Sequence, residues 1–197
     1  MTGMLSSSPG GWREAARAVR RSFAGALHPW RRARARARLM ASPPPATILV
    51  ICHGNLCRSP YAASALRRLL PPDASGIRIE SAGFVGPHRT PPAEALDVAA
   101  VRGIDLRRHK SRVATPGAVT GSDLVVVMEP GQVDALRSFG RTKQPVLVLG
   151  DLDPRPAIER TIRDPVEQPR IVFAETYDRI DRCLAALVNT TWGARAG

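Results

Sequence analysis

From Thr47 onward the chain alternates short apolar runs with amphipathic stretches. Four runs of four to six residues are rich in β-branched side chains, which is typical of buried parallel strands; they lie at 47–51, 77–81, 123–128 and 146–149. Helical spacing of apolar residues follows each run, at 61–70, 92–102, 132–139 and 171–188. The alternation predicts an α/β fold, a small doubly wound sandwich whose four-stranded parallel sheet carries helices on both faces.

The first 46 residues follow a different pattern and hold most of the charge. Of the net charge of +12, residues 1–46 contribute +8, from nine arginines and Glu14. A proline-rich stretch at 42–45 ends this region. We predict a basic, disordered extension at 1–46 and one domain at 47–197. A helix that contacts an anionic membrane or an acidic partner, a targeting segment, and a translation start at Met40 remain alternatives.

Charge and cysteine content limit the functional classes. Because the basic excess belongs to the extension, we expect no nucleic-acid binding by the domain. No run of about 18 apolar residues is present, so the sequence predicts no membrane span. Three cysteines do not suit a disulfide scaffold and favour a reducing, cytoplasmic compartment, where cysteines are free, metal-bound or catalytic.

The loop after the first predicted strand carries the clearest chemistry. Cys52 follows that strand directly, and Arg58 stands six residues later, where a helix begins. Gly54 and Asn55 accept left-handed backbone angles, so the loop can turn its N–H groups toward a tetrahedral oxyanion. The helix N-terminus and the Arg58 fork add positive charge. These features predict a phosphate-binding loop with the Cys52 thiolate as nucleophile.

Two other interpretations of this loop compete with an anion-binding site. Cys52 could be a buried structural residue beside a surface turn. A zinc site could form from Cys52, His53 and Cys57, although the Cys-x4-Cys spacing lacks a second pair of ligands nearby. The preceding strand, the central Gly-Asn and the Arg-Ser-Pro that opens a helix favour the anion loop over both.

Departure of the alcohol from a phosphate monoester requires a general acid, for which the sequence offers two candidates. Asp153 and Asp164 each precede a proline. A carboxyl group at such a position can donate a proton to the leaving oxygen and later accept one from water. It can also be a plain turn residue, because Asp before Pro favours turn initiation.

The motif 52–60 resembles the active-site loop of low-molecular-weight protein tyrosine phosphatases, bacterial type. The likeness continues through 81–83, 109–112, 123–129 and 164–165. It implies phosphotyrosine hydrolysis without metal or cofactor, with Cys52 as nucleophile, Arg58 as phosphate clamp and Asp164 as acid and base. Asp164 is preferred to Asp153 because the family places an aromatic nine residues after its acid, here Phe173.

The resemblance also implies supporting roles. Residues from the loop would bind the phosphate: His53, Gly54, Asn55, Leu56, Cys57 and Ser59. Asn55 would hold the loop through hydrogen bonds with Ser81 and His109, Ser59 would donate to the Cys52 sulfur, and Asp123 would orient Arg58. Cys57 would form a reversible, protective disulfide with Cys52. Phe84 is a candidate surface for the substrate ring, with an apolar lid residue as the alternative.

The same resemblance indicates the substrate class. Relatives that act on phosphoarginine carry Thr where this chain has Leu56, so Leu56 favours a phosphotyrosine protein. Bacterial members of this type commonly oppose tyrosine autokinases of capsule or exopolysaccharide export, which implies such a kinase as partner. A thiol-dependent arsenate reductase, a phosphoarginine phosphatase and a non-enzymatic phosphoprotein-binding module are the alternatives. The reductase would need further resolving cysteines, whereas only Cys183 lies downstream.

Overall fold

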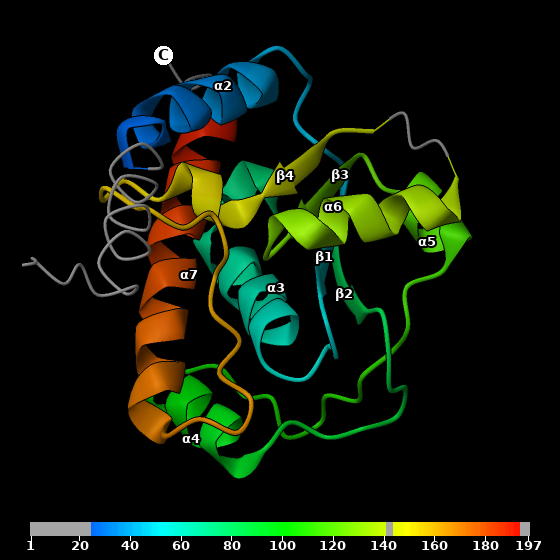
Figure 1. Ribbon diagram of the computed structural model, residues 1–197. Helices are drawn as coiled ribbons and strands as arrows, with labels where there is room; N and C mark the ends of the chain where they lie inside the picture. Colours follow the sequence, from blue (N-terminus) through cyan, green and yellow to red (C-terminus); the bar gives the residue numbers. More distant parts are fainter. Residues whose placement is uncertain (1–24, 141–143, 194–197) are drawn as a thin grey trace, which may run out of the picture.

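A computed structural model describes residues 25–140 and 144–193, built around one parallel sheet (Figure 1). Its strands are β1 (Thr47–Cys52), β2 (Arg78–Gly83), β3 (Leu124–Val127) and β4 (Val146–Val148). They lie in the order β2-β1-β3-β4, and every neighbouring pair is parallel. The predicted α/β fold with a four-stranded parallel sheet is confirmed.

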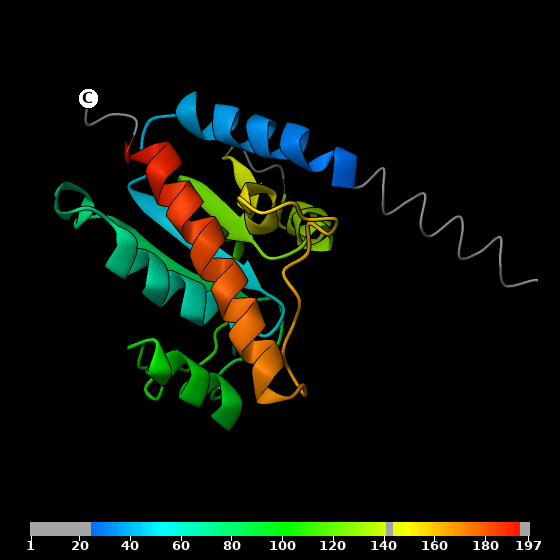
Figure 2. The same cartoon turned by 90° about the vertical axis from the view of Figure 1, so that its left-hand side faces the viewer.

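Helices cover both faces of the sheet (Figures 1 and 2). One face carries α3 (Arg58–Leu69) and the long α7 (Arg170–Thr191), against which α4 (Ala93–Val101) packs. The other face carries α5 (Pro116–Thr120) and α6 (Pro130–Leu136). The described residues also form the short 3-10 turns η1 (Pro72–Ala74), η2 (Arg137–Phe139) and η3 (Leu149–Leu152).

Alternation along β1 divides the apolar side chains between two core clusters. Ile48, Val50 and Cys52 belong to the larger cluster with α3 and α7, whereas Leu49 and Ile51 belong to the smaller one with α5 and α6. Successive side chains of a strand point to opposite faces. Because both faces of β1 are covered, all of these residues are buried, and the carboxyl end of β1 is held in a fixed position.

A helix precedes the sheet within the region for which the sequence predicted disorder. Helix α2 (His28–Met40) lies across α7 and η3 (Figure 2). It buries His28, Ala35 and Leu39, of which the last two are one helical turn apart and face the same side. The structure therefore differs from the expectation at residues 28–40. Residues 1–24, the first part of the predicted extension, lie outside the described residues.

Within the described part of the chain, no helix combines the length and the apolar character needed to cross a membrane.

Candidate active site

Cys52 is the last residue of β1, and α3 begins six residues later at Arg58. The Cys52 Sγ atom lies 3.0 Å from the Ser59 hydroxyl, and both side chains are buried. The loop between them turns at Asn55, whose φ of 53° is left-handed. Asn is one of the few non-glycine residues that accept this conformation. Gly54, for which the sequence also suggested such angles, does not have a positive φ.

The Asn55 side chain ties the loop to two other segments. Its amide nitrogen donates to the Ser59 hydroxyl at 2.9 Å and to the Ser81 hydroxyl on β2 at 3.0 Å. Its amide oxygen accepts the backbone N–H of Arg112 at 3.0 Å. The predicted neighbours Ser81 and His109 both surround Asn55, because His109 Nε2 lies 2.8 Å from the Asn55 carbonyl oxygen.

His109 acts here as a hydrogen-bond donor. A carbonyl oxygen carries no proton, so Nε2 must hold the hydrogen of the bond to Asn55. Burial lowers the pKa of His109, although the bond to Asn55 opposes that shift. The neutral ring with its proton on Nε2 therefore satisfies the contact at neutral pH.

Gly83, at the end of β2, allows the loop to approach the sheet closely. A Cβ atom on this residue would lie 2.7 Å from both the Asn55 nitrogen and the His53 oxygen. The His53 carbonyl also accepts the N–H of Phe84 at 2.7 Å. Sequence reasoning did not single out Gly83; a glycine at a strand end is the available signal for a close backbone approach.

Arg58 is fully buried at the start of α3, with 2% of its surface exposed. One terminal nitrogen donates to the Ile162 carbonyl at 3.0 Å and lies 3.7 Å from a Glu129 carboxylate oxygen. The other terminal nitrogen bonds the Asp164 carboxylate. The Nε atom is buried and has no hydrogen-bond partner in the described part of the chain. A buried donor without an acceptor is rare in proteins, and this N–H is available to a bound anion.

The prediction that Asp123 orients Arg58 is wrong. Asp123 precedes β3, and its carboxylate accepts the N–H groups of Ala46 and Thr47 at 2.9 and 2.8 Å. Those groups lie at the amino-terminal edge of the sheet, whereas the Cys52 loop lies at the carboxyl edge. Glu129, just after β3, is the carboxylate beside Arg58. Its side chain is held by Gln132 at 2.7 Å.

The two candidate acids occupy different environments. Asp164 contacts Arg58 in the site, and its side chain is 39% exposed. Asp153 is 3% exposed and is bonded by Arg179 and Arg182 at 3.0 and 3.2 Å. Burial alone would raise the pKa of Asp153, but the hydrogen bonds and charge of these arginines lower it overall. The geometry favours Asp164 as the group able to exchange protons with a ligand.

The loop backbone is suited to an anion. Within the described residues, the N–H groups of residues 54–57 donate to no protein acceptor. They surround the point where α3 begins, so the positive end of the helix dipole lies at the same place. Among the described residues, no three His, Cys, Asp or Glu side chains gather closely enough to hold a metal ion, Cys52, His53 and Cys57 included.

The remaining predicted residues lie around this loop. His53 is exposed, whereas Leu56 and Cys57 are buried in the larger core cluster. Burial and the neighbouring Cys52 raise the pKa of the Cys57 thiol, so it is protonated at neutral pH. Cys52 and Cys57 are free thiols. Phe84 is half-buried and stacks on Phe139, with ring centroids 6.3 Å apart.

A parallel sheet with a cysteine and an anion-binding loop after its first strand defines the class of α/β enzymes that hold an oxyanion against a thiol. The family model for low molecular weight phosphotyrosine protein phosphatases matches residues 47–193. The chain belongs to this family and is a protein-tyrosine phosphatase.

Individual relatives agree with this assignment. The probable low molecular weight protein-tyrosine-phosphatase EpsP of Ralstonia nicotianae is 35% identical over 145 residues, which cover 72% of this chain and 93% of that protein. The structure of Vibrio vulnificus Wzb in complex with benzylphosphonate is 28% identical, with a TM-score of 0.62 over 73% of this chain and 97% of that one. A YwlE arginine phosphatase structure, at 23% identity and a TM-score of 0.67 over 76% and 97% of the two chains, is similar in fold alone.

Proposed function

We propose that this phosphatase hydrolyses phosphotyrosine in proteins by covalent catalysis at Cys52, with Arg58 as phosphate clamp and Asp164 as acid and base. The observation that carries the proposal is the position of the Cys52 thiol, which lies 3.0 Å from Ser59 at the head of the helix that Arg58 opens. A nucleophile beneath an anion-binding loop is aimed at the phosphorus of a bound phosphate. Three free cysteines in the chain support a cytoplasmic location.

The first step transfers the phosphoryl group to the enzyme. The Cys52 sulfur forms a bond to phosphorus while the bond from phosphorus to the tyrosine oxygen breaks. Asp164, protonated at this stage, gives its proton to the leaving phenolate. The Ser59 hydroxyl, within hydrogen-bond distance of the sulfur, stabilises the thiolate before attack and again when it leaves.

The second step regenerates the enzyme. Asp164, now a carboxylate, accepts a proton from a water molecule, whose oxygen attacks the phosphorus. The sulfur–phosphorus bond breaks, inorganic phosphate leaves, and Cys52 returns as a thiolate. One carboxyl group thus serves both steps, which requires that it reach solvent, and the partial exposure of Asp164 supports that role.

Arg58 would bind two equatorial phosphate oxygens through its planar fork. Its buried Nε donor has no partner among the described residues and is available to one of these oxygens. A terminal nitrogen now bonded to Asp164 would supply the second bond. Glu129, 3.7 Å away and fixed by Gln132, would keep the guanidinium in position.

The partner of this reaction is a phosphotyrosine protein. EpsP and Wzb are named as tyrosine phosphatases, which supports phosphotyrosine over phosphoarginine as the substrate. From the resemblance to bacterial members of this family, we propose a tyrosine autokinase of exopolysaccharide or capsule export as the physiological substrate. The nearness of the Cys57 thiol to Cys52, five residues away in the same loop, supports a protective disulfide between them under oxidation.

The test is hydrolysis of p-nitrophenyl phosphate with chelator present. We expect Cys52→Ser to abolish turnover and Asp164→Ala to lower kcat by roughly 100- to 10,000-fold, the usual contribution of a general acid. Asp153→Asn is the matched control for the second Asp-Pro pair and should keep kcat. An inactive wild type, or an Asp164→Ala variant as active as the wild type, would overturn the proposal.

A further inference from the structure

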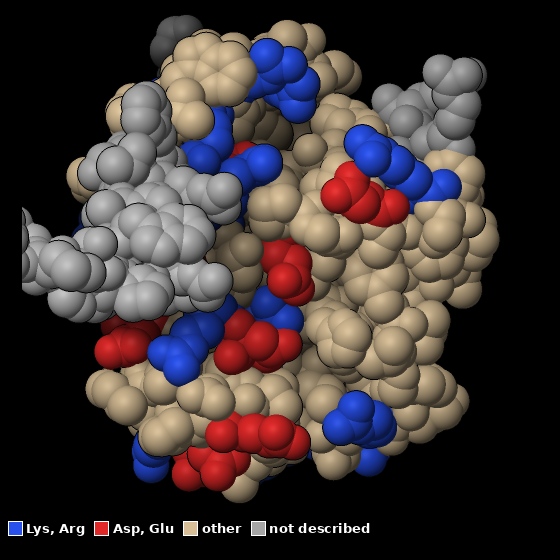
Figure 3. Space-filling model, viewed as in Figure 1, with Lys and Arg blue, Asp and Glu red and all other residues tan. Residues whose placement is uncertain are grey.

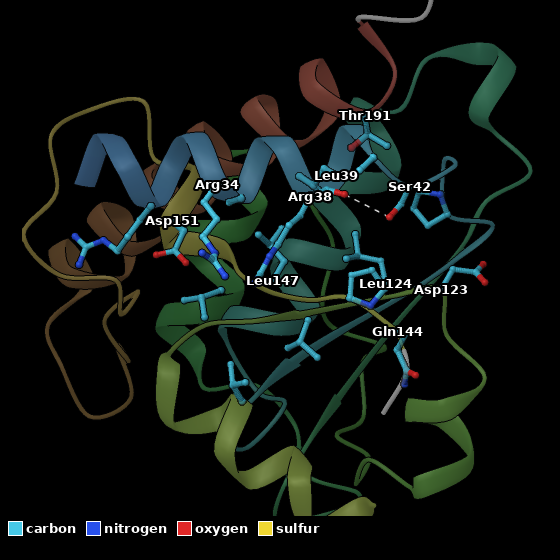
Figure 4. Close-up of a pocket in the computed structure, with 18 of the residues that line it drawn as sticks. Arg34, Arg38, Leu39, Ser42, Asp123, Leu124, Gln144, Leu147, Asp151 and Thr191 are labelled. Atoms are coloured by element: carbon cyan, nitrogen blue, oxygen red, sulfur yellow. Dashed lines mark hydrogen bonds between the residues drawn. The ribbon is translucent and has the colours of Figure 1, made fainter. Parts of the chain in front are cut away.

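A second cavity lies at the opposite edge of the sheet from Cys52. This α2 groove, of about 830 Å³, is enclosed by α2 on one side and by the amino ends of β3 and β4 on the other (Figure 4). Leu39, Leu124, Val133, Pro145 and Leu147 give it an apolar lining. Figure 3 shows the molecular surface hollowed just below α2, with basic side chains around the hollow. The reaction proposed for Cys52 uses none of these residues.

The charges that line the α2 groove do not cancel. Four arginines and two aspartates line it, which leaves a net charge of +2. Both carboxylates are already engaged, because Asp151 forms two hydrogen bonds of 2.8 Å with Arg160 and Asp123 accepts two backbone N–H groups. Within residues 25–140 and 144–193, Arg34 and Arg38 form no ion pair. The groove thus combines apolar surface with two arginines that lack an anionic partner.

Helix α2 builds this groove from outside the conserved domain of the family. The family model begins at residue 47, whereas α2 ends at Met40. The helix is nevertheless seated on the domain by buried Ala35 and Leu39, which hold Arg34 and Arg38 over the groove (Figure 4). The groove therefore lies between this chain's extension and the common phosphatase domain, and the extension supplies Arg34 and Arg38.

We propose that the α2 groove docks an acidic, leucine-containing segment of the protein substrate, outside the phosphotyrosine itself. This inference rests on the proposed function, since a protein phosphatase must bind a polypeptide. Carboxylates of the segment would pair with Arg34 and Arg38, and its apolar side chains would enter the groove. The six residues of β1 separate the two sites by about 20 Å, so the docked segment lies several residues from the tyrosine.

The shape of the groove favours a peptide over a membrane. A bilayer presents a flat charged surface and would contact the exposed arginines of α2 equally, including Arg36, which does not line the groove. The apolar lining formed by Leu124 and Leu147 is recessed beneath α2, where the flat surface of a bilayer cannot reach it. Arg36 thus provides a matched control on the same helix.

The binding test uses the full chain and a fluorescein-labelled twelve-residue peptide of alternating Glu and Leu, followed by fluorescence anisotropy. A Lys-Leu and a Glu-Ser peptide are the controls for charge and for apolar contact. Arg34→Glu and Arg38→Glu should each weaken binding of the Glu-Leu peptide roughly tenfold, the effect expected for reversing a charge at an interface. Arg36→Glu should change the Kd less than twofold. Hydrolysis of p-nitrophenyl phosphate should be unchanged in all three variants.

Several results would overturn the docking proposal. Equal binding of the Glu-Leu and Lys-Leu peptides, or equal losses in Arg36→Glu and Arg38→Glu, would remove the role of the groove. If the full chain binds phosphatidylserine vesicles through Arg38 but does not bind the peptide, α2 contacts a membrane instead. If the full chain forms a dimer that Arg38→Glu dissociates, the groove binds a second copy of the chain instead. Failure of the wild type to hydrolyse p-nitrophenyl phosphate would overturn the proposed function alone, because peptide binding is measured separately.

Discussion

Replacing Gly83 with Ala tests how closely the catalytic loop depends on the end of β2. The new Cβ would lie 2.7 Å from the Asn55 nitrogen and the His53 oxygen, and 2.9 Å from the Gly54 carbonyl carbon. These are backbone atoms, so no side-chain rotation can relieve the contact. Ordinary contact begins at 3.4 Å, so the loop and β2 must separate by about 0.7 Å.

We expect effects of similar size on turnover and on stability. Overpacking of a buried site costs about 1–3 kcal/mol, so the free energy of unfolding should fall by that amount. A displacement approaching 1 Å at a catalytic group can lower the rate about 100-fold. Because the atoms that move belong to the loop between Cys52 and Arg58, we expect kcat/KM for p-nitrophenyl phosphate to fall roughly 10- to 100-fold.

The assay pairs steady-state hydrolysis with urea unfolding of the same preparations. Gly131→Ala in α6 is the control, because a Cβ there meets nothing within 4 Å. It should keep kcat/KM and gain at most about 1 kcal/mol of stability from the smaller entropy of its unfolded chain. A Gly83→Ala variant with wild-type kcat/KM and unchanged unfolding would refute the argument that the loop packs against the β2 backbone.

Three further predictions concern groups outside the loop. Asp153→Ala leaves Arg179 and Arg182 without their carboxylate, so the free energy of unfolding in urea should fall by about 3 kcal/mol. A loss below about 1 kcal/mol would contradict the importance of these buried ion pairs. Asp123→Ala should cost about 1 kcal/mol for its two backbone hydrogen bonds and leave kcat unchanged; a large loss of kcat would restore its link to the active site. Burial, with help from nearby arginines, lowers the pKa of His28 below 6.5. The unfolded chain therefore binds that proton more readily, so the free energy of unfolding should fall as the pH drops below 6.5. The variant His28→Gln should weaken this pH dependence. An unchanged pH profile in that variant would show that another group causes the pH dependence.

For the candidate acid, similarity of sequence selected a residue that the structure places beside Arg58. Asp164 was preferred to Asp153 from its spacing to Phe173, and the structure places Asp164 on Arg58 and Asp153 in an arginine cluster. Asp123 illustrates the opposite case. The role of Asp123 was carried over from a motif. However, a residue that precedes a strand of a parallel sheet lies at the amino edge, whereas the Cys52 loop follows a strand and lies at the carboxyl edge. Because Glu129 follows β3, the direction of that strand alone would have selected Glu129 as the carboxylate beside Arg58.

Helix α2 could not be predicted from local pattern. Its sequence is rich in Arg and Ala, and only Ala35 and Leu39 mark a buried face. A helix with so narrow an apolar stripe is stabilised mainly by what it packs against. The surface that receives it is formed by η3 and α7, more than 100 residues away in the chain, so its order depends on contacts that composition does not reveal.

The sequence by itself determined the strand, the loop and the helix that bring Cys52 and Arg58 together, because these residues lie within one continuous segment. The parallel direction of the strands also followed, because apolar β-branched runs that alternate with helices favour a parallel sheet. The strand order β2-β1-β3-β4 came from the structure. Only the tertiary structure decided that Gly83 lies against the back of the loop and that Glu129 lies beside Arg58. Such contacts depend on the register between strands and the packing of separate segments, and neither is encoded in local spacing.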